Sequence, residues 1–378
     1  MSLIELHNLY KVFKTSGGDY LALKGIDLTF DAGEFTAIMG KSGSGKSTLI
    51  NMITGIDHPT SGVVRVGDVE IHDMKEGQLA EWRGRNLGIV FQFFQLLPTL
   101  TILENTMLPM DYCNRYEPAE REGKAMDLLK MLGLEEMADK LPAAVSGGQQ
   151  QIAAIARALA NDPPILVADE PTGNLDSRTA ERVLSIFEQL AAQCKTILIV
   201  THDPTLARRA TRRVLISDGE LINEMVAHAM HVLPHQQLLK ITHQVEKRSY
   251  APGATIARQG AVEDGLYIIS QGKVEVFQRG SPVQDGLPGS LLPGDYFSEL
   301  EMLETPACDL SFHASAQEPV EVLVLSRDDF YALMSQSSQA AEVLRQTAIQ
   351  RAMAYCPRAK RRAVASPPVK RRWLWGRK

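Results

Sequence analysis

The chain has 378 residues, of which 44% are hydrophobic and 22% charged, and its formal net charge is −5; these values are ordinary for a globular protein of two or three domains. No stretch approaches 18 uninterrupted apolar residues, and the N-terminus lacks a basic region followed by an apolar one, so we expect neither a membrane span nor a signal peptide. The four cysteines, Cys113, Cys194, Cys308 and Cys356, form no C-x-x-C pair, which argues against a zinc site or a disulfide framework and predicts reduced, buried thiols.

Residues 40–48 match the phosphate-binding pattern G-x-x-x-x-G-K-[ST], between a strand predicted over 35–39 and a helix predicted to open at Ser47. Glycines let consecutive backbone N–H groups turn toward a triphosphate, and the helix N-terminus adds its positive dipole end. Lys46 is predicted to reach the β- and γ-phosphates and the Ser47 hydroxyl to bind Mg²⁺. The candidate nucleotide ligands are Gly40, Ser42, Gly43, Ser44, Gly45, Lys46, Ser47 and Thr48, although Thr48 is expected to pack or cap rather than touch the nucleotide. This loop predicts an ATP or GTP site.

A second landmark is the short apolar run over 165–170, which predicts a buried parallel strand ending in Asp169 and Glu170. At the carboxyl edge of an open α/β sheet Asp169 can hold Mg²⁺, and Glu170 is placed to polarise the attacking water. The next predicted strand, 196–200, delivers His202 to the same edge, where it can contact the γ-phosphate.

Between these landmarks, Val145-Ser146-Gly147-Gly148-Gln149-Gln150 stands directly before a helix predicted over 151–161. Together with the phosphate loop, Asp169-Glu170, Gly173-Asn174-Leu175-Asp176 and His202 in that order, this segment resembles the ATP-binding cassette (ABC) ATPases over residues 1 to about 225. The resemblance implies an α/β P-loop domain with a helical subdomain.

The resemblance also implies roles for single residues. In the family, the signature segment Ser146, Gly147, Gly148 and Gln149 closes over the γ-phosphate held by the partner subunit's phosphate loop. Gln92 matches the glutamine that senses Mg²⁺ and the attacking water and couples to the membrane subunit. Phe13 matches the aromatic that stacks on adenine, with Tyr10 as the competing candidate, and Asp176 matches the aspartate that communicates across the dimer.

The signature departs from the family at two positions, because Val145 replaces the usual Leu and Ile152 replaces an Arg. The first change is minor. The second is expected either to weaken ATP turnover or to adapt that face to an apolar neighbour; with the remaining motifs intact, we expect hydrolysis.

Several segments narrow the branch of the family, among them Tyr20–Gly25, Val90–Pro98 and Leu103–Asn105. They look like the ATPases of lipoprotein release, macrolide export and cell division (LolD, MacB and FtsE type), which pair with a separate integral membrane permease. No long heptad segment intervenes between the phosphate loop and the signature, which disfavours the relatives with coiled-coil insertions that act on DNA, and no nucleic acid partner is expected.

The region from about 232 to 335 has short alternating strands broken by glycine turns, the pattern of a small antiparallel barrel or jelly roll, followed by a helix predicted over 327–335. It resembles the cyclic-nucleotide-binding domain, but Ser298 stands where the family has Gly before the ribose-binding Glu299, and Ala307-Cys308 stand where the phosphate-binding Arg is expected. A buried phosphate without its cation loses its main charge-assisted contact, so cyclic nucleotide binding is not expected. The alternative use of such a domain is dimer contact or partner docking.

The last 23 residues, 356–378, carry nine Lys or Arg and no acidic residue, which leaves 31 basic against 45 acidic residues in the rest. Its prolines and low apolar content predict disorder, while Trp373-Leu374-Trp375 between basic residues resembles an anchor for an anionic membrane surface. A solvated tail that touches nothing specific is the other interpretation.

The sequence therefore predicts an ABC ATPase domain over 1–228, a β domain over 229–355 and a basic tail over 356–378. The expected function is that of a Mg²⁺-dependent ATPase working as a homodimer with a separate permease at the inner face of the cell membrane. The alternative is a soluble ATP-dependent switch acting on a non-membrane partner.

Overall fold

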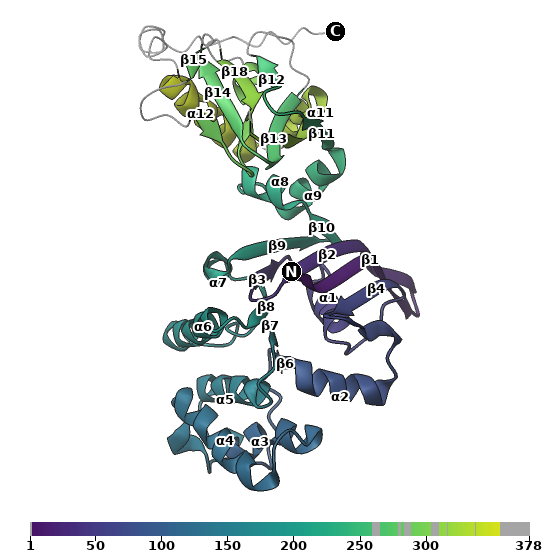
Figure 1. The fold of residues 1–378 in the computed structure, drawn as a ribbon, viewed down its shortest axis with the longest axis vertical. Helices are drawn as coiled ribbons and strands as arrows, with labels where there is room; N and C mark the ends of the chain where they lie inside the picture. Colours follow the sequence, from purple (N-terminus) through teal and green to yellow (C-terminus); the bar gives the residue numbers. More distant parts are fainter. Residues whose placement is uncertain are drawn as a thin grey trace, which may run out of the picture. The chain divides into compact units, whose positions relative to one another are not determined.

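The computed structural model (Figure 1) describes residues 2–258, 265–278, 281–282, 289–303, 310–315, 317–336 and 338–355. The chain divides into two compact units, the first ending at Ile222 and the second beginning at Asn223. The predicted boundary after residue 228 falls inside a helix of the second unit. The interpretations of the basic tail concern 356–378, which lie outside the described residues. Within the described residues, no helix is both long and apolar enough to span a bilayer.

The first unit combines an antiparallel sheet, a mainly parallel sheet and a group of helices. Its elements are β1 (Ser2–Thr15), β2 (Gly18–Asp31), β3 (Phe35–Met39), α1 (Lys46–Ile53), β4 (Ser61–Val66), β5 (Val69–Glu70), η1 (Ile71–Asp73), α2 (Glu76–Asn86), β6 (Leu87–Val90), α3 (Ile102–Cys113), α4 (Pro118–Met131), η2 (Glu135–Met137), η3 (Pro142–Ala144), α5 (Gly147–Leu159), β7 (Ile165–Asp169), α6 (Ser177–Ala192), β8 (Thr196–Thr201), α7 (Pro204–Arg209), β9 (Arg212–Ser217) and β10 (Glu220–Ile222). The antiparallel sheet has the order β2-β1-β4-β5, and the second sheet has the order β10-β9-β3-β8-β7-β6.

The central strands of the second sheet are parallel and almost fully buried, as their continuous apolar runs predict. β3 pairs with β8 on one side and β9 on the other, and β7 joins β8. Since parallel neighbours end at the same edge, the register brings the ends of β3, β7 and β8 together. This edge carries the phosphate loop and both predicted acidic residues.

The helix after the signature begins earlier than the sequence predicts, because α5 starts at Gly147 rather than at residue 151. Ser146 is its N-cap: the Ser146 Oγ accepts a hydrogen bond from the Gln149 backbone N–H at 3.3 Å, and the Ser146 N–H donates to Gln149 Oε1 at 2.8 Å. This capping box satisfies two N–H groups of the first turn, so the two glycines can be helical. The helix ends at Leu159, shortly before Asp162 adopts a left-handed φ of 52°.

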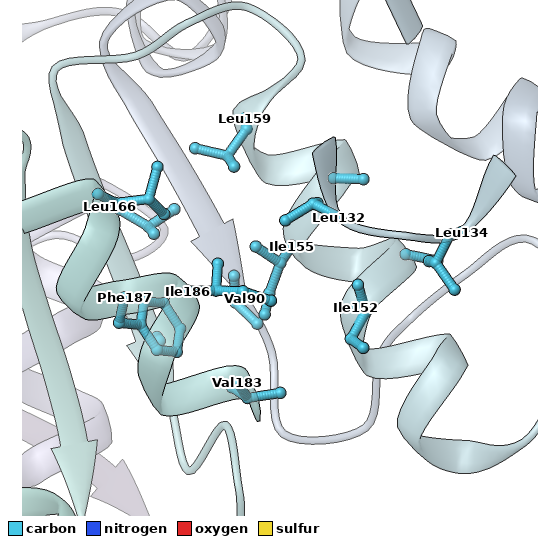
Figure 2. Close-up of a cluster of buried hydrophobic side chains, with 14 of the residues drawn as sticks. Val90, Leu132, Leu134, Ile152, Ile155, Leu159, Leu166, Val183, Ile186 and Phe187 are labelled. Carbon is cyan, nitrogen blue, oxygen red and sulfur yellow. The ribbon is translucent and has the colours of Figure 1, made fainter. Parts of the chain in front are cut away.

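Ile152 lies on the buried side of α5 with an exposed fraction of 1%. It belongs to a hydrophobic cluster that joins α5 to the helices and loops around it, including Leu134 and Ile155 (Figure 2). The apolar neighbour of this face is therefore the chain's own helical subdomain. An arginine at this position could not keep its guanidinium in solvent while its side chain follows the path of Ile152.

The second unit begins with two helices and continues into two antiparallel sheets. Its elements are α8 (Glu224–Ala229), α9 (His235–Gln244), β11 (Glu246–Tyr250), β12 (Thr255–Arg258), β13 (Gly265–Gln271), β14 (Val274–Gln278), β15 (Ser281–Pro282), β16 (Ser290–Leu291), β17 (Tyr296–Phe297), α10 (Glu299–Met302), β18 (Leu310–Ala314), β19 (Val320–Ser326), α11 (Arg327–Gln336) and α12 (Ser338–Tyr355). One sheet has the order β11-β19-β13-β17; the other has the order β12-β18-β14-β15, with β16 also paired to β14.

Aromatic rings from both sheets fill the interior of this β domain. The ring of Phe297 stacks on Tyr267 at 5.1 Å and on Phe312 at 4.5 Å between centroids. Ser298 has a φ of 72°, so it keeps the left-handed backbone that favours Gly, and Glu299 next to it is buried. Ala307 and Cys308 lie outside the described residues. The prediction of an α/β domain with a helical subdomain followed by a small β domain is confirmed.

The prediction of buried cysteines is wrong for the two that the structure describes, since Cys194 is exposed and Cys113 is half-buried. Cys194 follows α6 with a left-handed φ of 62°, a turn that leaves its side chain at the surface. Burial raises the pKa of the Cys113 thiol, which disfavours the reactive thiolate. Cys308 and Cys356 lie outside the described residues.

We predict that Ile152→Arg destabilises the protein, because a buried guanidinium in this cluster has no carboxylate to pair with among the cluster residues. Ile152→Ala should lower the free energy of unfolding by about 2–5 kcal/mol, as for other buried aliphatic truncations, and the arginine variant by at least as much. Thermal and denaturant unfolding would measure both changes. An arginine variant as stable as the wild type would show that this face can open to solvent.

Candidate active site

The phosphate loop connects β3 to α1 and needs glycine at three positions for steric reasons. Gly43 and Gly45 have φ values of 78° and 103°, which side chains rarely allow. A Cβ atom on Gly45 would lie 2.8 Å from the Ala22 carbonyl oxygen, and one on Gly40 would lie 2.4 Å from the Ile216 carbonyl oxygen. The close approach of β9 and β2 thus requires glycine at Gly40 and Gly45, and the left-handed backbone requires it at Gly43.

Lys46 is buried at the first position of α1, and its charge is held by the loop itself. The Lys46 Nζ donates to the carbonyl oxygens of Gly40 at 2.9 Å and Lys41 at 3.0 Å. The hydroxyl of Ser44, which is only 6% exposed, has no hydrogen-bond partner among the described residues. Buried polar groups are normally paired. The Lys46 ammonium, which can exchange its two carbonyl partners for phosphate oxygens, and the Ser44 hydroxyl therefore fit a phosphate ligand.

Ser47 and Asp169 form a pair of oxygen donors at the edge of the sheet. The Ser47 Oγ donates to the Asp169 Oδ2 at 3.1 Å. Burial raises the pKa of the Asp169 carboxyl, although the Ser47 hydrogen bond acts in the opposite direction. Hydroxyl and carboxylate oxygens are the ligands that Mg²⁺ takes beside nucleotide phosphates, so these residues fit that ion.

Glu170 follows Asp169 with a left-handed φ of 47°, which turns its side chain out of the strand. Its backbone N–H donates to the Val200 carbonyl at 2.9 Å, which fixes the turn to β8. The Glu170 Oε2 lies 2.8 Å from Nδ1 of His202, and the side chains are 13% and 70% exposed, respectively. The structure therefore joins the predicted water-polarising carboxylate to the predicted γ-phosphate contact.

The segment after Gln92 is held by the helix that carries the signature. Phe94 and Gln95 have φ values of 52° and 53°. The Arg157 guanidinium donates a hydrogen bond to the Phe94 carbonyl oxygen at 2.7 Å and another to the Gln95 carbonyl oxygen. Arg157 is a residue of α5, and burial lowers the pKa of its guanidinium. Because left-handed backbone is costly for residues other than glycine, Arg157 is what stabilises this turn.

The phosphate loop and the acidic pair line a pocket of about 640 Å³, of which Ser44 and Arg157 are not part. Of the predicted site residues the lining includes Gly40, Ser42, Gly43, Gly45, Lys46, Ser47, Thr48, Gln92, Asp169, Glu170 and His202, to which it adds Tyr20, Ala22 and Lys41. Thr48, expected to pack or cap, is thus part of the wall.

Tyr20 is the aromatic residue of this wall, and sequence reasoning did not select it. Phe13, which does not line the pocket, lies directly opposite Tyr20 in the pairing of β1 with β2, and the Lys11 Nζ covers its ring at 4.9 Å from the centroid. The Tyr20 hydroxyl lies 3.3 Å from the Gly43 carbonyl oxygen. The signal that could have identified Tyr20 is its place on the strand facing Phe13 across a short turn.

The signature residues and Asp176 lie outside the pocket lining. Ser146 and Gly147 are exposed at the start of α5, with Gly148 and Gln149 half-buried behind them. Asp176 is the N-cap of α6 and accepts hydrogen bonds from the Arg178 and Thr179 backbone N–H groups at 3.1 Å, and the Thr179 hydrogen bonds lower the pKa of its carboxyl. The exposed N-terminus of α5 is therefore no part of the pocket wall that the chain's own phosphate loop forms.

Comparison with known families gives two matches. Residues 23–173 match the family profile described as ABC transporter, and residues 247–337 match the profile described as cyclic nucleotide-binding domain. The second match covers the β domain.

Individual relatives match the first unit. The chain is 47% identical over 220 residues to the uncharacterized ABC transporter ATP-binding protein YvrO of Bacillus subtilis. The match covers 58% of this chain and 96% of that protein. It is 46% identical over 224 residues to the macrolide export ATP-binding/permease protein MacB of Syntrophobacter fumaroxidans. This match covers 58% of this chain but only 31% of that protein.

Among solved structures, the dimeric post-hydrolysis state of the ATP-binding cassette MJ0796, bound to ADP and Pi, is 42% identical with a TM-score of 0.56. The match covers 58% of this chain and 97% of that one. A protein of that name from Methanocaldococcus jannaschii is 44% identical over 226 residues, which is 59% of this chain and 96% of that protein.

We predict that Tyr20→Leu weakens ATP affinity about fivefold or more, because stacking of a base on an aromatic ring contributes about 1–3 kcal/mol. Tyr20→Phe keeps the ring and should stay within about twofold of the wild type if the long hydroxyl contact contributes little. Calorimetric titration with ATP would measure both. Tyr112→Leu is the matched control, since Tyr112 is 81% exposed on α3 and does not line the pocket.

The same titration on Phe13→Leu separates the two aromatic residues. A large loss with Phe13→Leu and none with Tyr20→Leu would contradict the assignment of Tyr20 and return the stacking role to the ring that the sequence indicated.

Proposed function

Because the chain belongs to the ABC transporter family of ATP-binding proteins, we propose that it is the ATP-hydrolysing subunit of a transporter, driving a separate membrane permease of the MacB or LolC type. The observation that carries this proposal is the convergence of Lys46, the Ser47–Asp169 pair and the Glu170–His202 pair on one pocket. Phosphate-binding, metal-binding and water-polarising groups are then available at one edge of the sheet.

Each group has a defined task in hydrolysis. Lys46 exchanges its loop carbonyls for the β- and γ-phosphate oxygens, and Ser47 with Asp169 and Gln92 would hold Mg²⁺, which when bound supplies positive charge to those oxygens. Glu170 accepts a hydrogen bond from the attacking water and orients it toward the γ-phosphorus. His202 keeps the Glu170 carboxylate in place and reaches the γ-phosphate from its exposed ring.

The signature supports a homodimer in which each ATP lies between two chains. Ser146 and Gly147 are exposed and make no part of the pocket wall, so their helix N-terminus is available to a phosphate held by another copy. The relative of known structure named above is dimeric. In this proposal Ser146 of one chain covers Lys46 of its partner around a two-fold axis.

The proposed contact with the permease lies beside Gln92. Phe93 is 72% exposed and Leu97 is 43% exposed on the segment that Arg157 holds in its left-handed turn. Phe93 and Leu97 form an exposed apolar pair next to Gln92 of the pocket wall, which suits a partner whose contact must change with the bound nucleotide. The chain would then sit at the cytoplasmic face of the membrane, and the β domain would act as a regulatory or docking module that takes no cyclic nucleotide.

The first test of this function is hydrolysis by single variants. Lys46→Ala should abolish ATP binding, and Glu170→Gln should bind ATP but lose on the order of 10²-fold or more in kcat, since it removes one preorganised group of the reaction. A phosphate-release assay with a binding titration measures both. Wild-type turnover in either variant would remove the assigned role.

The second test is ATP-dependent assembly of the full chain. Glu170→Gln should form a dimer when ATP fills the site and dissociate without it, and the double change Glu170→Gln with Lys46→Ala should show no ATP-dependent gain in mass by light scattering. Only the increment caused by ATP counts, so that any pairing through the β domain is subtracted. A constant mass at saturating ATP would refute the shared site.

The third test concerns the membrane partner. An integral membrane protein should co-purify with the wild-type chain from detergent extracts, and Phe93→Ser should reduce its recovery at least about threefold, as expected for loss of an exposed apolar anchor. Ile56→Ser is the matched control, because Ile56 is also exposed but lies in the loop after α1. Recovery of a non-membrane partner instead would favour the soluble switch.

A further inference from the structure

The segment that follows Gln92 has a strained turn at its centre. Phe94 and Gln95 are consecutive residues with left-handed backbone, and neither is glycine. Such a backbone persists only where the surrounding contacts hold it, and it is found most often at functional sites. The Arg157 guanidinium supplies these contacts by donating to both carbonyl oxygens. One side chain of α5 therefore keeps the turn in a costly conformation.

The far end of the same segment is held by a second side chain. Asn105 on α3 is fully buried, and its Oδ1 accepts a hydrogen bond from the Leu97 N–H at 2.7 Å. Its Nδ2 lies 3.1, 3.0 and 2.9 Å from the carbonyl oxygens of Leu97, Leu100 and Thr101, respectively. The segment is therefore anchored from Leu97 onward, independently of the turn before it.

The ring of Phe94 lies beside the signature. A Cβ atom placed on Gly147 would lie 3.9 Å from Phe94 Cζ, which is van der Waals contact. A Cβ atom on Gly148 would lie 2.4 Å from Thr179 Cγ2, and the Thr179 hydroxyl donates to the Asp176 carboxylate at 2.6 Å. The first turn of α5 is therefore bordered by the Phe94 ring at Gly147 and by the start of α6 at Gly148.

This first turn needs contacts from outside the helix. Gly147 and Gly148 occupy its first two positions, and glycine is the poorest helix former apart from proline. The capping box of Ser146 and Gln149 secures one N–H group at each end of the turn but leaves the flank of Gly147 exposed. The Phe94 ring is the side chain that covers part of this flank.

One helix thus makes both contacts of Phe94. Arg157 holds the Phe94 carbonyl oxygen at 2.7 Å, and Gly147 at the start of the same helix faces the ring. A relaxed backbone at Phe94 would change the direction of its side chain, because φ and ψ set where the Cβ atom points. Arg157 therefore determines where the ring lies.

We propose that Phe94, held by Arg157, is a positioning residue of the signature, whose exposed first turn its ring keeps in the capped conformation that receives the phosphate of the partner's nucleotide. The proposal rests on the shared ATP site proposed above and names what prepares the second half of that site. The N–H groups at a helix N-terminus attract an anion only while the turn is formed. Without the ring, the turn at Gly147 is open to water on one more side and opens more often.

The test uses full-length Glu170→Gln, which should bind ATP without turning it over. In this background Phe94→Ala should speed hydrogen–deuterium exchange of the Gln149 and Gln150 amides about threefold or more without nucleotide, because both amides are bonded to the cap. It should also weaken the ATP-dependent dimer about twofold to thirtyfold by light scattering. ATP affinity of the single chain, measured with a fluorescent ATP analogue below dimerising concentrations, should stay within about twofold, since Phe94 does not line the pocket.

A second pair of variants tests Arg157 by relieving the strain that it opposes. Arg157→Lys keeps the charge but loses the planar fork that reaches two carbonyl oxygens, and should act as Phe94→Ala does. Adding Gln95→Gly lets the turn keep its left-handed backbone without that support, so exchange and dimer affinity should both return at least about halfway. Cys194→Gly is the matched control, because Cys194 is also left-handed but follows α6, and it should restore neither.

Phe94→Leu fills part of the volume of the ring and should give a smaller change in the same direction, which keeps the test available if the alanine variant fails to fold. Equal exchange of the Gln149 and Gln150 amides in Phe94→Leu, Arg157→Lys and the parent chain would overturn the proposal. A loss of single-chain ATP affinity as large as the loss of dimer would also overturn it, because Phe94 would then act on the chain's own pocket.

The outcome for the proposed function is separate. If the Glu170→Gln chain gains no mass with ATP, the shared site is refuted, while the exchange of the signature amides still decides whether Phe94 and Arg157 position that turn. If Gln95→Gly and Cys194→Gly restore exchange equally, Arg157 acts through overall stability and its role as a positioning residue is refuted.

Discussion

The site depends on the parallel pairing of β3, β8 and β7. Their register places Met39 beside Thr201 and Asp169 beside Val200, so that the phosphate loop, the acidic pair and the loop of His202 all leave the sheet at one edge. Parallel strands require burial on both faces, and their apolar side chains supply it. The polar groups of the pocket can be held close together because the strands below them are rigidly packed on both sides.

The buried charges of the pocket show how the site is prepared for its ligand. The Lys46 ammonium is satisfied by two carbonyls of its own loop, and the Asp169 carboxylate has its pKa raised by burial, with the Ser47 hydroxyl as partner. Each group is in an environment that a phosphate or a cation improves. Burial is thus less a source of stability here than a means of making ligand binding favourable.

One helix connects three parts of the cassette. The N-terminus of α5 carries Ser146 at the surface, its middle contributes Ile152 to the hydrophobic core, and its last turns carry Arg157, which holds the carbonyls of Phe94 and Gln95. The signature and the segment after Gln92 are therefore joined through a single helix. The burial of Ile152 ties this helix to its subdomain by apolar contact.

The sequence by itself determined the features that are local along the chain: the phosphate loop, the acidic pair after β7, the order of the motifs and the strand-and-glycine pattern of the β domain. These are fixed by backbone geometry and short-range chemistry, so spacing alone reveals them. It missed what depends on contacts distant in sequence. Tyr20 rather than Phe13 lines the pocket because of cross-strand register, α5 begins at its capping box, and Cys194 is exposed because of a left-handed turn. The hydrogen bond from the Gly219 N–H to the Ser44 carbonyl oxygen joins residues far apart in the chain. Only the folded sheet decides that the turn after β9 reaches the phosphate loop.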